Sequence, residues 1–171
     1  MSKLRKLHST QKERSSRHDS KLAPKNPFSL DMSKSLFKKV GGRLQESYGI
    51  KLNADHHLLA ASKEQIYLCS PDITKLQGKL HFEKIGTPIA KIDGLYYRPT
   101  HHLGQTLGHL ATKQFITLDD TQMQAYSQNH DLDLPVAPIT KGDKYRIVKR
   151  ENFGMSVIKQ LPNGWKNKWG K

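Results

Sequence analysis

Apolar side chains follow a helical period between Asp31 and Tyr48, the clearest hydrophobic pattern in the chain. They recur at three- and four-residue spacing, which places them on one face of an α-helix. These positions are Leu36, Phe37, Val40, Leu44 and Tyr48. Ser33 or Asp31 can cap the start of this helix, and Gly49 can end it. Gly41 and Gly42 each cost about 1 kcal/mol relative to alanine, so a break there is the alternative.

Short runs typical of β-strands follow this helix. The segments HLLAAS (57–62) and QIYLCS (65–70) predict a hairpin that turns at Lys63-Glu64. PDITKLQG (71–78) is compatible with a single helical turn. FEKIGTPIAKI (82–92) predicts a strand that is interrupted at Pro88 and followed by a turn at Asp93-Gly94.

Helical spacing returns in RPTHHLGQTLGHLA (98–111). Leu103, Leu107 and Leu110 form its apolar stripe. We expect Pro99 in the first turn, where its missing N–H costs nothing.

A further helix is expected in DDTQMQAYSQNH (119–130), which follows the short run FITL (115–118). Thr117 with Asp120 three residues later resembles a capping box, and Met123 and Tyr126 are expected to face inward.

The last part of the chain predicts a second hairpin. DLDLPVAP (131–138) is expected to be an extended connector, because its prolines bias the preceding residues away from helix. DKYRIVKRE (143–151) and GMSVIKQL (154–161) then predict a β-hairpin. Scattered short strands with two or three helices favour an α+β fold that ends in a small β-rich module.

The formal net charge of +14 is concentrated at the two ends of the 171-residue chain. Residues 1–40 contain 11 Lys/Arg against three Asp/Glu, and residues 141–171 contain nine against two, so the middle is close to neutral. Clustered cations gain free energy by releasing the counterions condensed on a polyanion. Nucleic acid is therefore the expected partner. We expect no membrane partner, because no strongly apolar amphipathic segment is present to insert.

Residues 1–30 are rich in Ser, Lys and Arg and contain few apolar positions. Such a stretch cannot bury enough surface to offset the entropy of ordering it, so we expect a disordered basic arm. The chain has neither a long apolar run nor a secretory signal peptide, and it contains a single cysteine. These features predict a soluble, cytoplasmic protein.

Signals for catalysis are weak. The glycine patterns of phosphate-binding and dinucleotide-binding loops do not occur in the sequence. His101, His102 and His109 lie on one predicted helix without Cys or acidic partners nearby, so we expect no metal and no cofactor. Cys69 has no local base to form a thiolate and is expected to fill core space. An enzyme with an acid/base site in the 97–102 region is the alternative, and it needs a pocket that brings titratable groups together.

Basic side chains of the second hairpin are the strongest candidate for a binding surface. A strand along KYRIVKR places Lys144, Arg146 and Arg150 on one face and Tyr145 and Ile147 on the other. We therefore expect an inward apolar face and an outward phosphate-binding face. Later lysines extend this basic strip: Lys159, Lys166, Lys168 and Lys171. A solvated face without a ligand is the alternative.

Three motifs in residues 57–171 follow the order and spacing of a known family. GLYYRPTHHLGQTL has an aromatic-x-Pro-Thr-His helix start, and LDDTQMQAYSQN has a helix with Leu and Tyr at fixed positions. The third motif, at the end of the chain, is a strand followed by Lys, then Lys-Asn and an aromatic residue. The matched residues are Tyr97, Pro99, Thr100, His101, Leu118, Tyr126, Lys159, Lys166, Asn167 and Trp169. In these motifs the chain resembles the C-terminal region of bacterial rRNA cytosine-5 methyltransferases of the Nol/Nop/Sun family, RsmF branch.

This resemblance implies a PUA-like RNA-binding module, a pseudo-barrel, over residues 113–171, preceded by a small α/β domain over residues 31–112. The catalytic methyltransferase domain and its cysteine motifs are absent from the sequence, so the resemblance implies RNA binding without methylation. The layout is also similar to Nip-type ribosome-biogenesis factors, which have no catalytic activity.

The expected function is therefore non-catalytic binding of rRNA or pre-ribosomal RNA, in ribosome biogenesis or as an accessory to an RNA-modification enzyme. Further possible partners are a ribosomal particle or a methyltransferase. The alternative is a protein-interaction subunit that docks on a separate methyltransferase or another acidic partner. We expect the tryptophans to close the module as core, with Trp169 better placed than Trp165 to stack on a base. The candidate RNA-contact residues are Arg98, His101, Lys144, Arg146, Lys149, Arg150, Lys159, Lys166, Asn167, Lys168 and Trp169.

Overall fold

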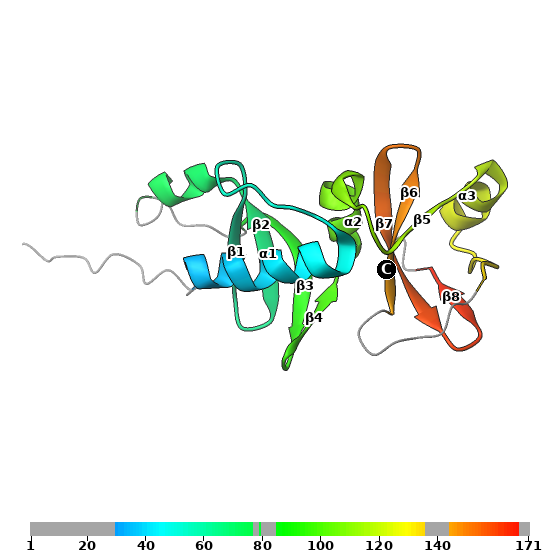
Figure 1. Ribbon diagram of the computed structural model, residues 1–171, viewed down its shortest axis with the longest axis horizontal. Helices are drawn as coiled ribbons and strands as arrows, with labels where there is room; N and C mark the ends of the chain where they lie inside the picture. The colour runs from blue at the N-terminus through cyan, green and yellow to red at the C-terminus, as the bar shows by residue number, and fades with distance from the viewer. Residues whose placement is uncertain (1–29, 77–78, 80–84, 136–143, 168–171) are drawn as a thin grey trace, which may run out of the picture.

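The structure, a computed structural model, describes residues 30–76, 79, 85–135 and 144–167 of the chain. Within these ranges the protein is a mixed α+β fold built around two four-stranded sheets (Figure 1). The predicted basic arm lies outside the described residues except for Leu30. No helix of the described part is long and apolar enough to cross a membrane.

The first sheet is an antiparallel meander whose strands lie in chain order. Its elements are β1 (Leu58–Ala61), β2 (Gln65–Cys69), β3 (Thr87–Asp93) and β4 (Tyr96–Pro99). The predicted hairpin at Lys63-Glu64 is confirmed by the pairing of β1 with β2. β3 passes through Pro88, and the β2–β3 register shifts between Ile66 and Tyr67, close to the position where the sequence predicts an interruption.

Helix α1 (Lys34–Tyr48) covers one face of this sheet, and both of its ends match the sequence prediction. The N–H of Leu36 donates to Ser33 Oγ at 3.1 Å, which satisfies one of the donors exposed at a helix start. Gly49 ends the helix at φ +69°, a left-handed conformation that glycine adopts without strain. The helix continues unbroken through Gly41 and Gly42, because its apolar face is held in the core.

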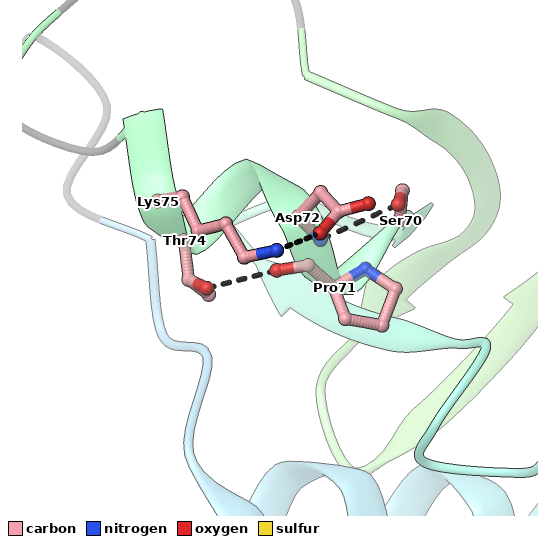
Figure 2. A network of polar contacts seen from close by, with 5 residues as sticks. All are labelled: Ser70, Pro71, Asp72, Thr74 and Lys75. Carbon is pink, nitrogen blue, oxygen red and sulfur yellow. Dashed lines mark hydrogen bonds and ion pairs between the residues drawn. The ribbon is translucent and has the colours of Figure 1, made fainter.

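The short 3₁₀ helix η1 (Pro71–Leu76) follows β2 and confirms the predicted helical turn. Its first residues are held by side chains, as Figure 2 shows. The N–H of Asp72 donates to Ser70 Oγ at 3.3 Å, and Thr74 Oγ1 donates to the Pro71 carbonyl at 2.8 Å. Lys75 Nζ forms an exposed ion pair with Asp72 at 2.6 Å.

Helix α2 (His101–Leu107) and the 3₁₀ helix η2 (Gly108–Leu110) lie between the two sheets (Figure 1). The prediction that Pro99 occupies the first helical turn is wrong. Pro99 is the last residue of β4, where it pairs with Ala90, and Thr100 occupies the N-cap position. Thr100 Oγ1 donates to the Pro88 carbonyl at 2.6 Å, so contacts with the sheet delay the start of the helix.

The second sheet contains one parallel pair, between β5 and β6, and two antiparallel pairs. Its strands, in sheet order, are β5 (Phe115–Thr117), β6 (Tyr145–Arg150), β7 (Phe153–Leu161) and β8 (Gly164–Lys166). The predicted second hairpin is confirmed by the pairing of β6 with β7. Among the described residues this sheet has two edges and does not close into a barrel.

Helix α3 (Asp120–Ser127) packs on the second sheet through Tyr126, which is fully buried. A capping box is present, but its members are Asp119 and Gln122 instead of the predicted Thr117 and Asp120. Thr117 belongs to β5, where it pairs with Lys149. The strand therefore continues to Thr117, and the helix starts two residues later than the motif suggests.

The main hydrophobic core joins the two sheets through α2. Leu103 and Leu107 of α2 contribute to it, together with Ile147 and Val157 from β6 and β7. Gly104 lets the helix approach β7 so closely that a Cβ at this position would overlap the backbone carbonyl of Ser156. A second core lies between the second sheet and α3, and it contains Tyr126 and Trp165.

Candidate nucleic-acid interface

A row of polar side chains crosses three strands of the second sheet. The strand registers place Tyr145 opposite Lys159, and Lys159 opposite Lys166. Directly opposed residues of antiparallel strands point to the same face, so these three side chains lie side by side. Two residues along the strands, Ile147 and Val157 share this face and belong to the main core. The row therefore begins where the apolar contact with α2 ends.

The other face of this sheet, which the sequence predicts to be outward and phosphate-binding, is covered at its centre, while Lys144 and Arg150 at its two ends are exposed. Val148 and Ile158 are fully buried there, in the second core. The guanidinium of Arg146 lies 5.6 Å from the centre of the Trp165 ring, a cation–π contact. Both faces are covered because α2 packs on one and α3 with Trp165 packs on the other.

A cleft of about 770 Å³ opens between the two sheets. Its walls come from the second half of α1, from the β3–β4 hairpin and from the start of β6, with the end of β7 beside it. The basic residues that line it are Arg43, Arg98, Lys113, Lys144 and Lys159. Four tyrosines line it as well: Tyr48, Tyr96, Tyr97 and Tyr145. The combination of cations and aromatic rings is typical of a nucleic-acid binding surface.

The two acidic residues that line the cleft are both engaged by arginines. Glu46 is 3.9 Å from Arg43, and Asp93 forms an ion pair with Arg98. Lys113, Lys144 and Lys159 form no ion pair among the described residues. The three lysines thus give the cleft a net positive charge that an anionic ligand can neutralise.

Tyr145 links the two walls of the cleft electrostatically. Burial raises the pKa of its phenol, the charge of Arg98 partly offsets this, and Asp93 raises the pKa further. The phenol is therefore neutral at physiological pH, and it faces the Arg98–Asp93 pair of the β3–β4 hairpin. The hairpin and the start of β6 are close enough for their charges to interact across the cleft.

Backbone hydrogen bonds hold the segments that carry the three lysines. The N–H groups of Thr112 and Lys113 both donate to the Tyr48 carbonyl, at 2.9 and 3.0 Å, which ties this connection to the end of α1. The N–H of Gln160 donates to the Lys144 carbonyl at 2.7 Å. These bonds hold the backbone of the segments from which the lysines extend.

Two of the sequence-predicted RNA contacts are buried and hold the fold together. Lys149 is 8% exposed, and its Nζ donates to the Ala111 carbonyl at 2.5 Å; burial lowers the pKa of this amine. The Asn167 side-chain amide donates to the carbonyls of Tyr126 and His130, at 2.7 and 3.2 Å. Both side chains are engaged with backbone carbonyls, and they do not line the cleft.

The other predicted residues lie at different places on the molecule. Arg150 forms an ion pair with Asp120 of α3 at 2.7 Å. The rings of His101 and His102 are tilted by 44° with their centres 3.8 Å apart, and burial together with the charge of His102 lowers the pKa of His101. Lys168 and Trp169 lie outside the described residues, as does Lys171.

Trp165 is confirmed as a core residue. It is 4% exposed, and its Nε1 donates to the Pro135 carbonyl at 3.3 Å. Its ring supports the sheet on the side opposite to Lys159 and Lys166.

Sequence reasoning missed Arg43, Lys113 and Tyr96 as members of a site. Arg43 looked like an ordinary polar residue on the outer face of a helix, and Lys113 was one lysine in a connection. For Tyr96 the sequence contains one indication, because the residue follows the predicted Asp93-Gly94 turn and therefore lies near the tip of a hairpin.

The structure separates the residues on which the acid/base alternative depends. Tyr97 and Arg98 line the cleft, but His101 and His102 do not. No group of three metal-binding side chains is found in the part of the chain that the structure describes. Cys69 is buried among apolar residues, and burial raises the pKa of its thiol, so the reactive thiolate is disfavoured.

Comparison with known proteins finds distant similarity to rRNA methyltransferases. No protein-family model matches the chain. The ribosomal RNA small subunit methyltransferase F of Shewanella piezotolerans is 26% identical over 147 residues, which is 84% of this chain and 30% of that protein. The protein of the same name from Shewanella loihica is 26% identical over 121 residues, 71% of this chain and 24% of that protein. The chain thus spans less than a third of the length of these relatives, and the predicted resemblance is confirmed at the level of a partial region.

Proposed function

We propose that this chain is a non-catalytic RNA-binding protein that acts on rRNA or pre-ribosomal RNA, in ribosome biogenesis or as an accessory to an RNA-modification enzyme. The observation that carries this proposal is the cleft between the sheets, where three lysines that form no ion pair with any described residue lie among tyrosine rings. The net charge of +14 and the similarity to proteins named as rRNA methyltransferases support the same class of ligand.

The mechanism that we propose is binding of phosphates by Lys113, Lys144 and Lys159. Each contact releases a condensed counterion, so the affinity depends on salt. Lys166 is exposed and lies in register with Lys159, so it extends the phosphate path along the second sheet. The basic N-terminal residues add affinity without sequence preference.

The remaining predicted RNA contacts form two groups, residues that can reach a phosphate and residues that support the binding strands. Arg98 lies in the cleft and Arg150 at the far end of β6, where each can reach a phosphate. Lys168 and Trp169 follow Lys166 in the sequence and stay proposed contacts, as does the half-buried His101. Lys149, Asn167 and Arg146 have protein partners, and we propose that they hold the binding strands in place.

The proposal extends to the domain organisation. We propose that residues 31–112 form a small α/β domain and residues 113–171 a PUA-like module. The mixed second sheet, covered by α3 and supported by Trp165, is compatible with this assignment. The similarity to part of the methyltransferase F proteins supports it as well.

Crosslinking of the protein to RNA in cells, followed by mapping of the bound sites, tests this proposal. We expect discrete crosslinks in rRNA or its precursors that are lost in a Lys113→Gln, Lys144→Gln, Lys159→Gln variant. Crosslinks that merely follow RNA abundance, and that persist in the variant, would contradict it. A protein partner that still co-purifies after ribonuclease treatment would favour the protein-interaction alternative instead.

A further inference from the structure

We propose that the cleft binds unpaired nucleotides of single-stranded RNA, with a base stacked on Tyr96 and the adjoining phosphates held by the lysines of the opposite wall. This inference rests on the proposed RNA-binding function and adds the class of RNA that the cleft recognises. It distinguishes a single strand from a double helix.

The Tyr96 ring is presented to solvent at the tip of the β3–β4 hairpin. Tyr96 is 62% exposed and its neighbour Leu95 is 84% exposed, although large apolar side chains usually contribute to packing. Neither residue belongs to any of the hydrophobic clusters of the described chain. An aromatic face that is exposed beside a basic cleft provides a surface on which a base can stack.

A second planar group lies beside this ring. Arg98 stands two residues after Tyr96 on the edge strand β4, so both side chains lie on the same face of the sheet. Asp93 on β3 is the register partner of Tyr96, so its side chain points to the same face of the sheet. There it forms an ion pair with Arg98 that holds the guanidinium. A guanidinium plane stacks on a base much as an aromatic ring does. The hairpin wall therefore offers two adjacent stacking surfaces.

The opposite wall supplies positive charge. Lys144 and Lys159 come from the start of β6 and the end of β7, and Lys113 from the connection before β5. A nucleotide carries its base at one end and its phosphate at the other. A cleft with stacking groups on one wall and lysines on the other therefore matches both ends of an unpaired nucleotide.

The size of the cleft favours the same ligand. Its volume of 770 Å³ lies within the range of about 300–1,000 Å³ that is typical of small-ligand pockets, and one or two nucleotides can enter it. In a double helix the bases are stacked on each other and paired, and proteins contact mainly its phosphates and riboses. A duplex could touch the lysines, but it has no base free to stack on Tyr96.

The test measures the fluorescence anisotropy of two labelled RNAs at moderate salt. One is a single strand of about a dozen nucleotides without self-complementarity, and the other is a blunt duplex of the same length. We expect the full-length protein to bind the single strand at least about tenfold more tightly. Tyr96→Ala should weaken single-strand binding by about 5- to 140-fold, the usual effect of losing one stacked base. Binding of the duplex should not change.

Phe153→Ala provides the matched control, because Phe153 is 69% exposed and lies outside the cleft. It should leave the binding of both RNAs unchanged, and Tyr96→Phe should retain single-strand binding. Equal binding of the two RNAs by the wild type, or full single-strand affinity in Tyr96→Ala, would overturn this inference and leave RNA binding intact. Binding of neither RNA would overturn the proposed function as well.

Discussion

At the scale of single residues, Asn167 connects the end of the last described strand to the segment after α3. Its backbone N–H donates to Asp131 Oδ1 at 3.0 Å, while its side chain donates to two backbone carbonyls. The side chain is 3% exposed, so water cannot replace these bonds when they are lost. Asn167 therefore positions β8, the strand that carries Lys166.

Asn167→Ala should lower the free energy of unfolding by about 1–3 kcal/mol, because it removes the two hydrogen bonds that the buried side-chain amide donates. Urea denaturation followed by circular dichroism measures the difference. Asn163→Ala, in the exposed turn between β7 and β8, is the control and should change stability by less than about 0.5 kcal/mol. Equal stability of the two variants would show that the hydrogen bonds of the Asn167 side chain do not support the fold.

His101 gives the folded protein a sensitivity to acid. Burial and the charge of His102 lower its pKa below the ordinary value of 6.5, so the unfolded chain takes up a proton first as the pH falls. The contribution of His101 to stability is complete above pH 6.5 and is lost as the pH falls below it.

His101→Gln should therefore make the free energy of unfolding less dependent on pH between about 7.5 and 5.5 than in the wild type. Denaturation at several pH values measures this slope. His56→Gln, an exposed histidine in a turn, controls for the loss of one imidazole. A slope that is unchanged in His101→Gln would refute the assignment.

At the scale of elements, the contact between α2 and β7 joins the two sheets. Gly104 makes this contact possible, because any side chain there would collide with the β7 backbone. A Cβ at Gly154, at the start of β7, would likewise overlap the Gly104 carbonyl oxygen. The close approach of α2 to β7 therefore requires glycine at both positions, because any side chain would separate the two backbones.

Gly104→Ala should lower the free energy of unfolding by about 1–3 kcal/mol, since the helix must move away from the strand. Gly42→Ala makes the same chemical change in α1, where a Cβ would meet nothing within 4 Å. It should raise stability by up to about 1 kcal/mol, because alanine is the better helix former. Thermal or urea unfolding of both variants measures the contrast, and the same sign in both would contradict this view of the contact.

Elements whose determinants lie close together in the sequence could be predicted. α1 has a clear apolar period, a Ser33 cap and Gly49, and both hairpins have their strands joined by short turns. Predictions failed where distant residues decide the outcome. Pro99 is held in β4 by pairing with β3, and Thr117 is held in β5 by its parallel partner β6, about 30 residues away. The hydrophobic periodicity of the sequence contains no information on these strand pairings.

At the scale of the whole molecule, the cleft gathers residues from segments that span more than 100 positions, from Arg43 to Lys159. The sequence predicts Lys144 and Lys159 as members of a basic strip, and it places Arg98 among the candidate RNA contacts. It could not show that Lys113 and Arg43 lie beside them, since this depends on how α2 positions the two sheets. The sequence also predicts an outward face for Arg146. In the structure α3 and Trp165 cover this face, and the sequence pattern does not reveal such a tertiary contact.

Selective RNA binding depends on where the positive charges lie, because the net charge alone would attract any polyanion. Two variants that remove the same charge separate the cleft from the general field. One carries Lys113→Gln, Lys144→Gln and Lys159→Gln, and the other carries Lys34→Gln, Lys51→Gln and Lys63→Gln, three exposed lysines that do not line the cleft. Both lower the net charge by the same amount.

The salt dependence of RNA binding in these two variants tests the central claim most directly. Fluorescence anisotropy with an rRNA fragment gives the slope of log K against log salt concentration. The cleft variant should bind more weakly than the wild type, and its slope should be shallower by about 2, the value for three lost phosphate contacts. The control variant should keep nearly the wild-type slope. Equal slopes in the two variants, or a wild-type affinity that does not change with salt, would contradict the account.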